Sequence, residues 1–531
     1  MLQRIRSLLD FPVRRAAVPA SSISRPKAQA GAHQGASTTD RETASWLPSF
    51  GSADADLLDD LPMLRARNRD LAINNGIASG AIQTITDNVV GTGFRLSAKP
   101  DYRALGRDTD WADDWSNQIE ALWRSWSEGT DCDAGRTLNF AGLTQLVFRS
   151  GMLNGEALVL PMWLPGQGTF STSFQVIEAD RLATPPHRID GKGMRAGIEI
   201  NAYGAPLAYW IKKTHPGDDF AGAATFAWDQ GPQDWRRIPT LTPWGRKRVL
   251  HIHDKERTGQ SRGKPLFSAV MKQFRMLDKY QSSELQAAVI NAMIAAFVET
   301  PLDQDSMVEM FGGDTDQYLA DRNAYIKNRV RLKGGAVMPL YPGDKMSSFS
   351  PNRPSDKFAP FVDAMNRHVA ASLNMPYELL LKDFSKTNYS SARAALLEAW
   401  RFFNGRRKWL SDHWAQPVYE LWLEEVVDAG LIDAPGFDEH RRAYARAFWI
   451  GPGRGWVDPV KEAKAAQIRM DIGVSTLERE CAEQGLDWEE VLEQRARERK
   501  RMAELDLLDV ANVVSSQPFI PDPPNLEETK P

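Results

Sequence analysis

Apolar residues recur at helical spacing over a longer stretch near residue 400 than anywhere else in the chain. They stand at Ala395, Leu396, Ala399, Trp400 and Phe403, then at Leu410, Trp414, Val418, Leu421 and Trp422. This spacing places them on one helical face. Ser390 and Ser391 are candidate N-terminal caps, Gly430 is a candidate C-terminal cap, and Pro417 predicts a kink. The pattern therefore predicts one long helix, about 60 Å in length.

A polar, basic segment precedes this helix. Pro376 cannot continue the helix before it, so Tyr377 to Tyr389 is predicted to form a loop. Its polar or basic positions, with one basic residue just beyond it, are Lys382, Asp383, Ser385, Lys386, Asn388, Tyr389 and Arg393. The basic side chains among them are candidates for phosphate contacts, although lysines in any exposed loop are often simply solvated. Because two or three charges bind duplex DNA weakly, this interpretation depends on their repetition in an oligomer.

The rest of the chain alternates helical and strand patterns. A helical pattern from Leu61 to Val90 is interrupted at Asn74-Asn75-Gly76, and further helices are predicted at 111–127, 140–152 and 358–373. Strand patterns with turn residues fill 155–253. A long helix follows, with a predicted buried stripe at Phe274, Leu277, Tyr280, Leu285, Ala288, Val289, Ala292 and Ile294. The predicted fold class is α+β, mainly helical.

Two more strand patterns and a set of short helices complete the prediction. Gly334-Gly335 between two β-type runs predicts a hairpin, and a strand is expected in AYARAFWI after Gly430. Short polar helices follow Pro459.

Composition limits the possible functions. The 531 residues are 42% hydrophobic and 25% charged, as is usual for soluble proteins, and the net charge is −4. This charge argues against a protein that binds nucleic acid over its whole surface, so contact with DNA would be local. The longest apolar run, 287–298, is shorter than the ~20 residues of a membrane span, and we expect no membrane partner.

Both ends of the chain are predicted to lack stable structure. Residues 1–60 form a basic arm rich in Ala, Ser, Gly and Pro, for which a flexible arm is favoured over an organelle transit peptide. Residues 515–531 are rich in proline and acidic residues, and are predicted to be disordered.

The candidate chemical motifs have structural explanations that fit better. GQSRGKP at 259–265 has the Gly-Lys pair of a phosphate loop, but its glycine spacing is one residue short and Pro265 replaces the hydroxyl that binds magnesium. His251 and His253 share one face of a predicted strand beside Asp254, so a metal site is conceivable without an identifiable third ligand. Cys132 and Cys481 are far apart and are predicted to be free thiols. We therefore expect no cofactor and no enzymatic activity.

Several blocks in this order resemble the portal proteins of lambda-like tailed bacteriophages. They are RARNRDLAINNGIASGAIQTITDNVVGTGFRL, NGEALV, HIHDKERTGQSRGKPLFSAV, MPYELLLKDFSKTNYSSARAALLEAWR and WVDPVKEAKAAQIRMDIGVSTLEREC. The resemblance runs from about Leu61 to Lys500 and implies a ring of about twelve subunits around a central channel. It also implies passage of double-stranded DNA, contacts with the terminase large subunit, major capsid and scaffold proteins and a head-tail connector, and a place at the portal vertex of the virion after assembly in the host cytoplasm.

The family architecture divides the chain as follows. It has an arm at 1–60, a wing at 61–264, a stem helix at 265–298, a clip at 299–352, a second stem helix at 353–374, a tunnel loop at 375–390, a long wing helix and return at 391–455, a crown at 456–514 and a tail at 515–531. The resemblance implies that the loop residues named above face DNA. The clip hairpin would carry Arg331, Lys333, Gly334 and Gly335.

Three alternatives remain at the level of sequence. A metal-dependent enzyme would use His251, His253 and Asp254. A monomeric scaffold or adaptor of a phage-like particle would share the helical body without forming a ring. A portal from a defective prophage or a gene-transfer particle would have the same biochemistry as one from an active phage.

Overall fold

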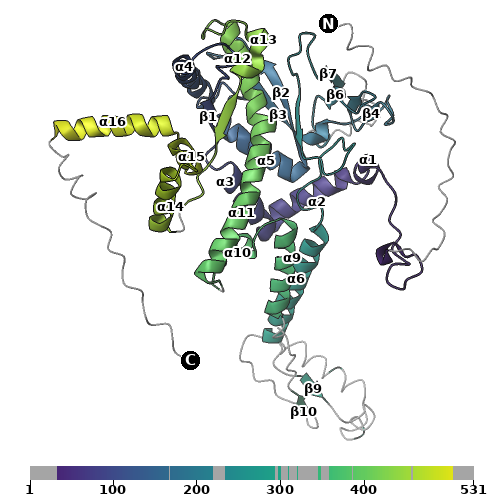
Figure 1. The fold of residues 1–531 in the computed structure, drawn as a ribbon. Coiled ribbons are helices and arrows are strands. Elements are labelled where there is room, and N and C mark those ends of the chain that lie inside the picture. The colour runs from purple at the N-terminus through teal and green to yellow at the C-terminus, as the bar shows by residue number, and fades with distance from the viewer. Residues whose placement is uncertain are drawn as a thin grey trace. The chain divides into compact units, whose positions relative to one another are not determined.

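A computed structural model describes residues 33–505 except for 167, 219–233, most of 294–357, 386 and 456–457. The chain divides into two units, Met1–Ser52 and Ala53–Pro531. In the first unit the described residues include a short 3-10 helix, Gln34–Ala36. The hairpin predicted at Gly334-Gly335 lies outside the described residues. The second unit mixes helices with a smaller share of strands, which confirms the α+β, mainly helical prediction (Figure 1).

Five helices lie in the first part of the second unit. They are α1 (Ala53–Leu57), α2 (Leu61–Asn74), α3 (Gly76–Val89), α4 (Thr109–Ser127) and α5 (Phe140–Asn154). Among them, α3, α4 and α5 supply many of the core residues of this unit. The predicted break between α2 and α3 is confirmed. Asn75 is extended and its side chain accepts a hydrogen bond from the amide of Ala78 at 3.0 Å, so this residue ends one helix and caps the next.

Antiparallel strands form three small sheets in this region. One sheet has the order β3-β2-β8, with β2 (Glu156–Trp163), β3 (Thr172–Ile177) and β8 (Leu250–His253). A second follows chain order, with β4 (Met194–Arg195), β5 (Ile198–Ile200), β6 (Pro206–Lys212) and β7 (Trp235–Pro239). The third pairs β1 (Arg95–Ala98) with β11 (Ala447–Ile450), two strands that are about 350 residues apart in the sequence.

The long helix predicted near residue 400 has three consecutive parts. These are α11 (Tyr389–Leu410), a π-helical turn (Ser411–Ala415) and α12 (Gln416–Asp428). The irregularity expected at Pro417 takes the form of the π turn just before it, because proline cannot donate the usual backbone hydrogen bond. Gly430 has φ +67° and its amide donates to the carbonyl of Val427, while the amide of Leu431 donates to that of Val426. This is the glycine cap predicted for the helix end.

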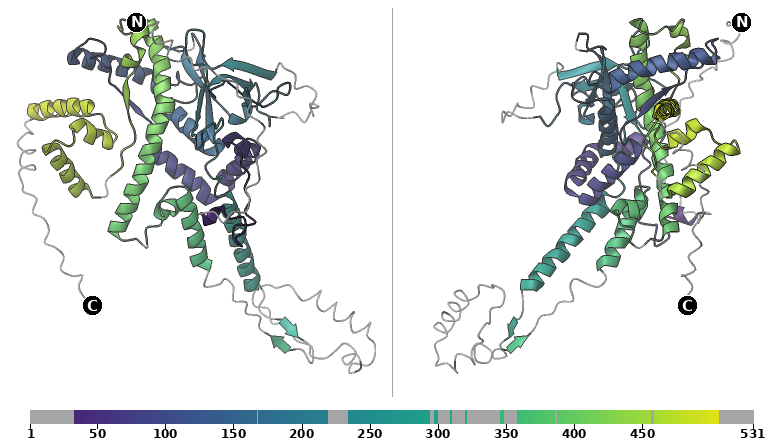
Figure 2. Two further views of the ribbon diagram at one scale, coloured as in Figure 1. Left: turned by 45° about the vertical axis from the view of Figure 1, so that its right-hand side comes forward. Right: turned by 90° about the vertical axis from the view of Figure 1, so that its left-hand side faces the viewer.

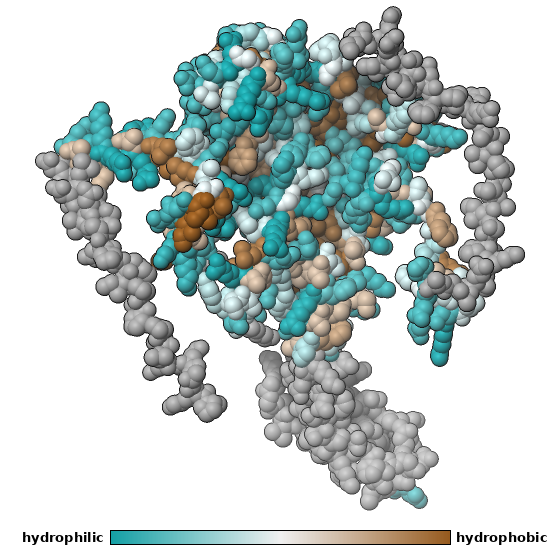
Figure 3. Space-filling view, in the orientation of Figure 1, coloured by the Kyte–Doolittle hydropathy of each residue, from teal (hydrophilic) through white to brown (hydrophobic). Residues whose placement is uncertain are grey.

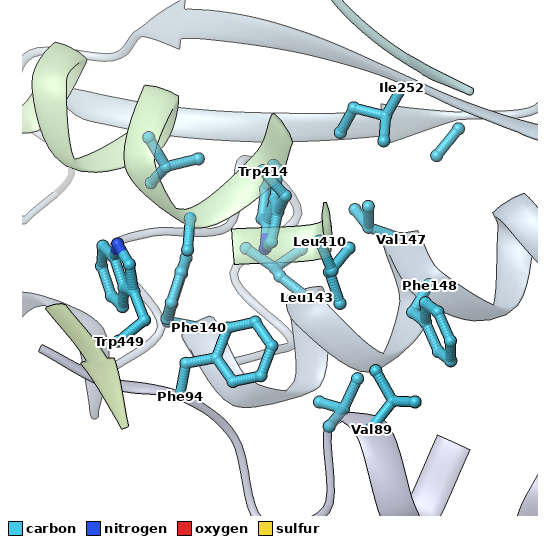
Figure 4. Packing of buried hydrophobic residues seen from close by; sticks show 14 of the residues in the cluster. Val89, Phe94, Phe140, Leu143, Val147, Phe148, Ile252, Leu410, Trp414 and Trp449 are labelled. Carbon is cyan, nitrogen blue, oxygen red and sulfur yellow. The ribbon is translucent and has the colours of Figure 1, made fainter. Parts of the chain in front are cut away.

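Trp414 connects the π turn to the main core. It is fully buried, its indole Nε1 donates to Thr144 Oγ1 at 2.9 Å, and its ring stacks on Phe140 with centroids 5.8 Å apart (Figure 4). Leu143 and Val147 of α5 complete this part of the core. The long helix is therefore fixed to α5 and the β3-β2-β8 sheet, which lie on different sides of Trp414.

Two helices lead away from this body side by side (Figures 1 and 2). They are α6 (Met271–Met293) and α9 (Phe358–Ser372), joined by the ring of Tyr280, whose centroid lies 5.1 Å from that of Phe361. At their far end β9 (Phe297–Glu299) pairs with β10 (Lys345–Ser347). The predicted buried stripe on α6 holds only near the body, because Leu285 is 67% exposed and Val289 is 51% exposed in a single chain.

α13 (Phe437–Tyr444) packs into the main core through Phe437 and Tyr444. The last helices of the described chain form a small group of their own, α14 (Pro459–Asp471), α15 (Leu477–Glu483) and α16 (Trp488–Glu504). Ion pairs join α15 and α16 to the strand β1 region, including Lys99 with Glu478 at 3.1 Å and Arg95 with Glu490 at 2.6 Å. Charged contacts therefore contribute to the junction between this group and the body.

Two further predictions concern cysteines and membrane crossing. Cys132 and Cys481 are buried and free, as predicted, and burial raises the pKa of the Cys132 thiol to about 12. Among the described helices, none combines the length and the apolar content that a bilayer crossing requires.

Candidate functional site

The loop predicted to face DNA is shorter than the sequence suggested. The prediction of a loop from Tyr377 is wrong, because α10 (Tyr377–Leu381) occupies its first part, with Pro376 at the N-cap. The apolar run YELLL explains the difference: Leu380 is buried in the main core, and α10 packs against α3 and α9. The connection before the next helix therefore covers only 382–388.

Lys382 begins this short loop in an unusual backbone conformation. Its φ is +56°, in the left-handed region, and its amide donates to the carbonyl of Glu378 to close α10. A residue other than glycine in this region has a conformational cost on the order of 1 kcal/mol. The Lys382 side chain is exposed, and no described residue forms an ion pair with it. It is thus available for a partner outside the chain.

Asn388 closes the loop and starts the long helix. Its Oδ1 accepts hydrogen bonds from the amide of Ser391 at 2.9 Å and from the hydroxyls of Ser390 and Ser391, both at 2.8 Å. The prediction that the two serines cap this helix is therefore wrong. An asparagine side chain is an equally good cap, and it lets the helix begin one residue earlier, at Tyr389.

The candidate residues do not all lie together. Asp383, Ser385 and Asn388 share the loop with Lys382, and the Asp383 carboxylate accepts the Ser385 amide at 3.0 Å. Tyr389 is 52% exposed, with the ammonium of Lys461 6.0 Å from its ring centroid. Farther along α11, Arg393 is half-buried beside a cavity that also contacts Arg454 and Glu462. The positions outside the described residues are Lys386, Arg331, Lys333, Gly334 and Gly335.

A buried ionic cluster that the sequence analysis missed lies around Glu156. This carboxylate is fully buried and accepts hydrogen bonds from Arg65 at 2.6 Å, from Arg262 at 2.5 Å and from the Gly263 amide at 3.1 Å. His251 Nε2 lies 3.0 Å from its other oxygen. Burial pulls the pKa of Glu156 upward, but Arg262, Arg65 and His251 outweigh burial and hold that pKa well below its ordinary value.

Side chains from separate segments of the sequence meet in this Glu156 cluster. Arg65, Glu156, His251 and Arg262 come from RARNRD, NGEALV, HIHD and GQSRGKP, four of the motifs singled out above. The cluster fixes the segment that leads into α6 against α2 and the β3-β2-β8 sheet. The sequence did contain one signal, a glutamate at the start of the apolar strand EALVLP, since a buried carboxylate needs partners.

Each predicted metal ligand has another contact, and the three do not form a candidate metal group in the part of the chain that the structure describes. His251 is bound to Glu156, the ring of His253 stacks on His251 at 4.3 Å, and Asp254 pairs with Arg406 at 2.5 Å. Two guanidinium groups already neutralise Glu156, and their charges would repel a divalent cation. Likewise, GQSRGKP turns Arg262 inward to this cluster and forms no phosphate cradle.

One other group in the described chain has metal-ligand types within reach. Glu178, Asp180 and His215 lie close together. Asp180 already pairs with Arg69 and lies 3.7 Å from Arg65, and these two cations lower its pKa against the effect of burial. The arrangement is that of a partly exposed ion-pair network.

Comparison with known proteins identifies the family. Residues 39–407 match the family described as phage portal protein, lambda family. Over 486 residues the chain is 34% identical to portal protein B of Escherichia phage lambda, covering 88% of this chain and 89% of that protein. The chain belongs to the lambda family of phage portal proteins.

Further relatives agree with this family. A portal protein of Escherichia phage N15 is 34% identical, covering 88% of this chain and 90% of its own length, and a probable portal protein of Halomonas phage phiHAP-1 is 28% identical over 473 residues. A solved chain from the neck of an empty GTA particle aligns with a TM-score of 0.46 and 14% identity, over 85% of this chain and 99% of that one. A TM-score this low supports no conclusion about this chain. Proteins of this portal family are structural components of the virion.

Proposed function

We propose that this chain assembles into a ring of about twelve copies at one capsid vertex, and that double-stranded DNA passes through the channel during packaging and ejection. Family membership supports the portal role. The observation that carries the ring is the set of apolar side chains that one chain leaves exposed on its stem helices.

The stem helices expose more apolar surface than a monomer would be expected to keep. Met276 and Leu285 on α6 are 57% and 67% exposed, and Phe361 on α9 is 49% exposed. Figure 3 shows a second group of apolar side chains over α14 and α15, where Ile472 is 66% exposed and Val474 is 61% exposed. Grouped apolar side chains of this kind mark contact surfaces, and copies of the same chain are the partner proposed here.

The loop at 382–388 is the proposed DNA contact. Exposed Lys382, together with Lys386, would supply a weak positive site in each subunit. A ring would repeat this site along a DNA backbone, so the charges would act together although each binds weakly. The chain's net charge of −4 gives no overall positive field that would hold DNA tightly, which favours sliding.

The remaining partners are proposed from the family. The pairing of β9 with β10 brings residues 299 and 345 together at the end of the stem helices. The intervening clip segment would meet the terminase large subunit and later the head-tail connector. Capsid and scaffold proteins would hold the ring at the vertex.

Replacing Lys382 and Lys386 together by alanine tests the loop. We expect the ring to form normally while packaged DNA per particle falls several-fold, because the loop contacts on DNA are lost. The measurement is DNA per particle in a complementation assay, with ring formation of the purified variant checked in parallel. Lys408→Ala is the matched control, since Lys408 is exposed on α11 and pairs with Asp412 within its own helix. Unchanged DNA yield in the double variant would contradict the proposed role of the loop.

A further inference from the structure

A rigid turn between β7 and β8 presents an exposed tryptophan. The Thr242 amide donates to the Arg246 carbonyl at 2.8 Å, and the Arg246 amide donates to Thr242 Oγ1 at 2.9 Å. Gly245 supplies the φ of +92° that the turn requires. Trp244 at the tip is 70% exposed. Because these hydrogen bonds fix the backbone of the turn, little backbone freedom is left to lose when a partner binds at Trp244.

A second exposed tryptophan faces the same cavity. Trp163 ends β2 and is 55% exposed. It and Trp244 line a cavity of about 440 Å³, together with Glu424 and Asp428 of α12. The Arg246 guanidinium lies 5.8 Å from the Trp163 ring centroid and 2.6 Å from a Glu424 oxygen. Arg246 therefore links Trp163 to α12 in the lining of this cavity.

Three cations at the edge of the cavity are left without partners in the described chain. Arg236, Lys247 and Arg248 all line it. None of them forms an ion pair with a described residue, whereas Arg246 and Arg441 both pair with Glu424. These three cations outnumber the two carboxylates of the lining, Glu424 and Asp428, and Glu424 is already paired. We name this surface the Trp-Arg cavity, defined by Trp163, Trp244, Arg236, Lys247 and Arg248.

We infer that the Trp-Arg cavity is a docking surface for an acidic segment of another protein. Tryptophan and arginine are the residue types that most often dominate binding energy at protein interfaces. The unpaired cations complement carboxylates, and the two indoles offer apolar contact to side chains beside those carboxylates. Duplex DNA is a poorer fit, because its exterior is phosphate and sugar and offers the two indoles no apolar side chain to contact. This inference does not depend on ring formation.

The test uses the full-length protein and defined probes. A fluorescent twelve-residue peptide of alternating Glu and Leu is compared with the same peptide in Gln and Leu, and with a labelled twenty-base-pair DNA duplex, by fluorescence anisotropy at fixed salt. The variants are Trp244→Ala and the pair Arg236→Glu with Lys247→Glu. Controls of the same types are Tyr203→Ala, at a residue 96% exposed on the wing, and Arg442→Glu on α13.

We expect the Glu peptide to bind wild type at least tenfold more tightly than the Gln peptide does. Each cavity variant should weaken Glu-peptide binding about tenfold, while the controls and DNA binding stay unchanged. Equal binding of the Glu peptide to wild type and to the cavity variants would overturn the inference. So would loss of DNA binding, or of self-assembly, in the cavity variants with peptide binding retained, since the surface would then serve DNA or a second copy of this chain.

Discussion

At the scale of single residues, Glu156 has the largest expected effect on stability. Glu156→Gln keeps the shape of the side chain but leaves Arg262 buried without its negative partner, and leaves Arg65 with only Asp180, 3.7 Å away. Removing one partner of a buried ion pair usually costs about 3–5 kcal/mol in the free energy of unfolding. Denaturant unfolding followed by circular dichroism measures this loss.

The control for this variant is Glu398→Gln. Glu398 is exposed and lies 3.4 Å from Arg401 on the surface of α11, where an ion pair is worth less than about 1 kcal/mol. If both variants lose the same small amount of stability, Glu156 does not hold the cluster together as described.

His253 gives a pH dependence that can be isolated by a single substitution. Burial first, and then His251, lower the pKa of His253 to about 3 from an ordinary value of 6.5. As the pH falls below 6.5, the unfolded chain therefore takes up a proton at this residue and the folded chain does not. The free energy of unfolding should decrease through this range by at most about 1.4 kcal/mol per pH unit. His253→Phe keeps the stacked ring and removes the titration.

Other groups titrate in the same pH range, so the free energy of unfolding of wild type must be measured relative to that of His253→Phe. Burial raises the pKa of Glu120 to about 7, so this carboxyl favours folding as the pH falls and opposes His253. Glu156 contributes only below its unfolded value of 4.5. We expect the stability of wild type to fall relative to His253→Phe between pH 7 and pH 5. Parallel curves would show that His253 titrates normally in the folded chain.

At the scale of elements, the connection between body and stem depends on two glycines. A Cβ at Gly263 would lie 1.9 Å from the Gly155 carbonyl oxygen and 3.0 Å from His253 Cβ. Gly263→Ala would therefore separate the α6 leading segment from β2 and cost about 3 kcal/mol or more. Thermal unfolding measures the loss. Gly151→Ala in α5, where no atom lies within 4 Å, should be neutral or slightly stabilising. Equal stability of the two variants would contradict the close contact.

Most elements could be predicted from the sequence, because their signals are local. The cap at Asn75 and the glycine end of the long helix are examples. The start of α11 and the presence of α10 could not, since YELLL is too short to show a helical period and its burial depends on α3. The exposed face of α6 was predicted as buried because an apolar pattern does not say whether its partner is in the same chain.

The Glu156 cluster could not be predicted for a different reason. Glu156 is 91 residues from Arg65 and 106 from Arg262, so only the fold brings these side chains together. For the candidate loop, the sequence placed Lys382, Asp383, Ser385 and Asn388 in one segment, and the structure has these four in the connection at 382–388. The sequence could not show that Asn388 closes the loop or that Arg393 is half-buried in α11.

At the scale of the whole molecule, we expect a ring that depends on α6 and α9, the proposed stem. The main core and the Glu156 cluster fix the start of α6, while Leu285 and Val289 farther along remain exposed in one chain. Copies of the chain would cover these residues in a ring. The stem would then line the channel, and each loop at 382–388 would be carried on the end of a long, rigid helix.

Electron microscopy of the purified, untagged protein, with native mass spectrometry, tests this claim most directly. We expect closed rings of about a dozen subunits with an axial hole. We also expect Leu285→Glu with Val289→Glu to abolish rings without unfolding the chain, while Ile189→Glu, at a residue that is 90% exposed, leaves the rings intact. A wild-type protein that stays monomeric even with scaffold protein present, or rings unaffected by the α6 substitutions, would contradict the proposed ring.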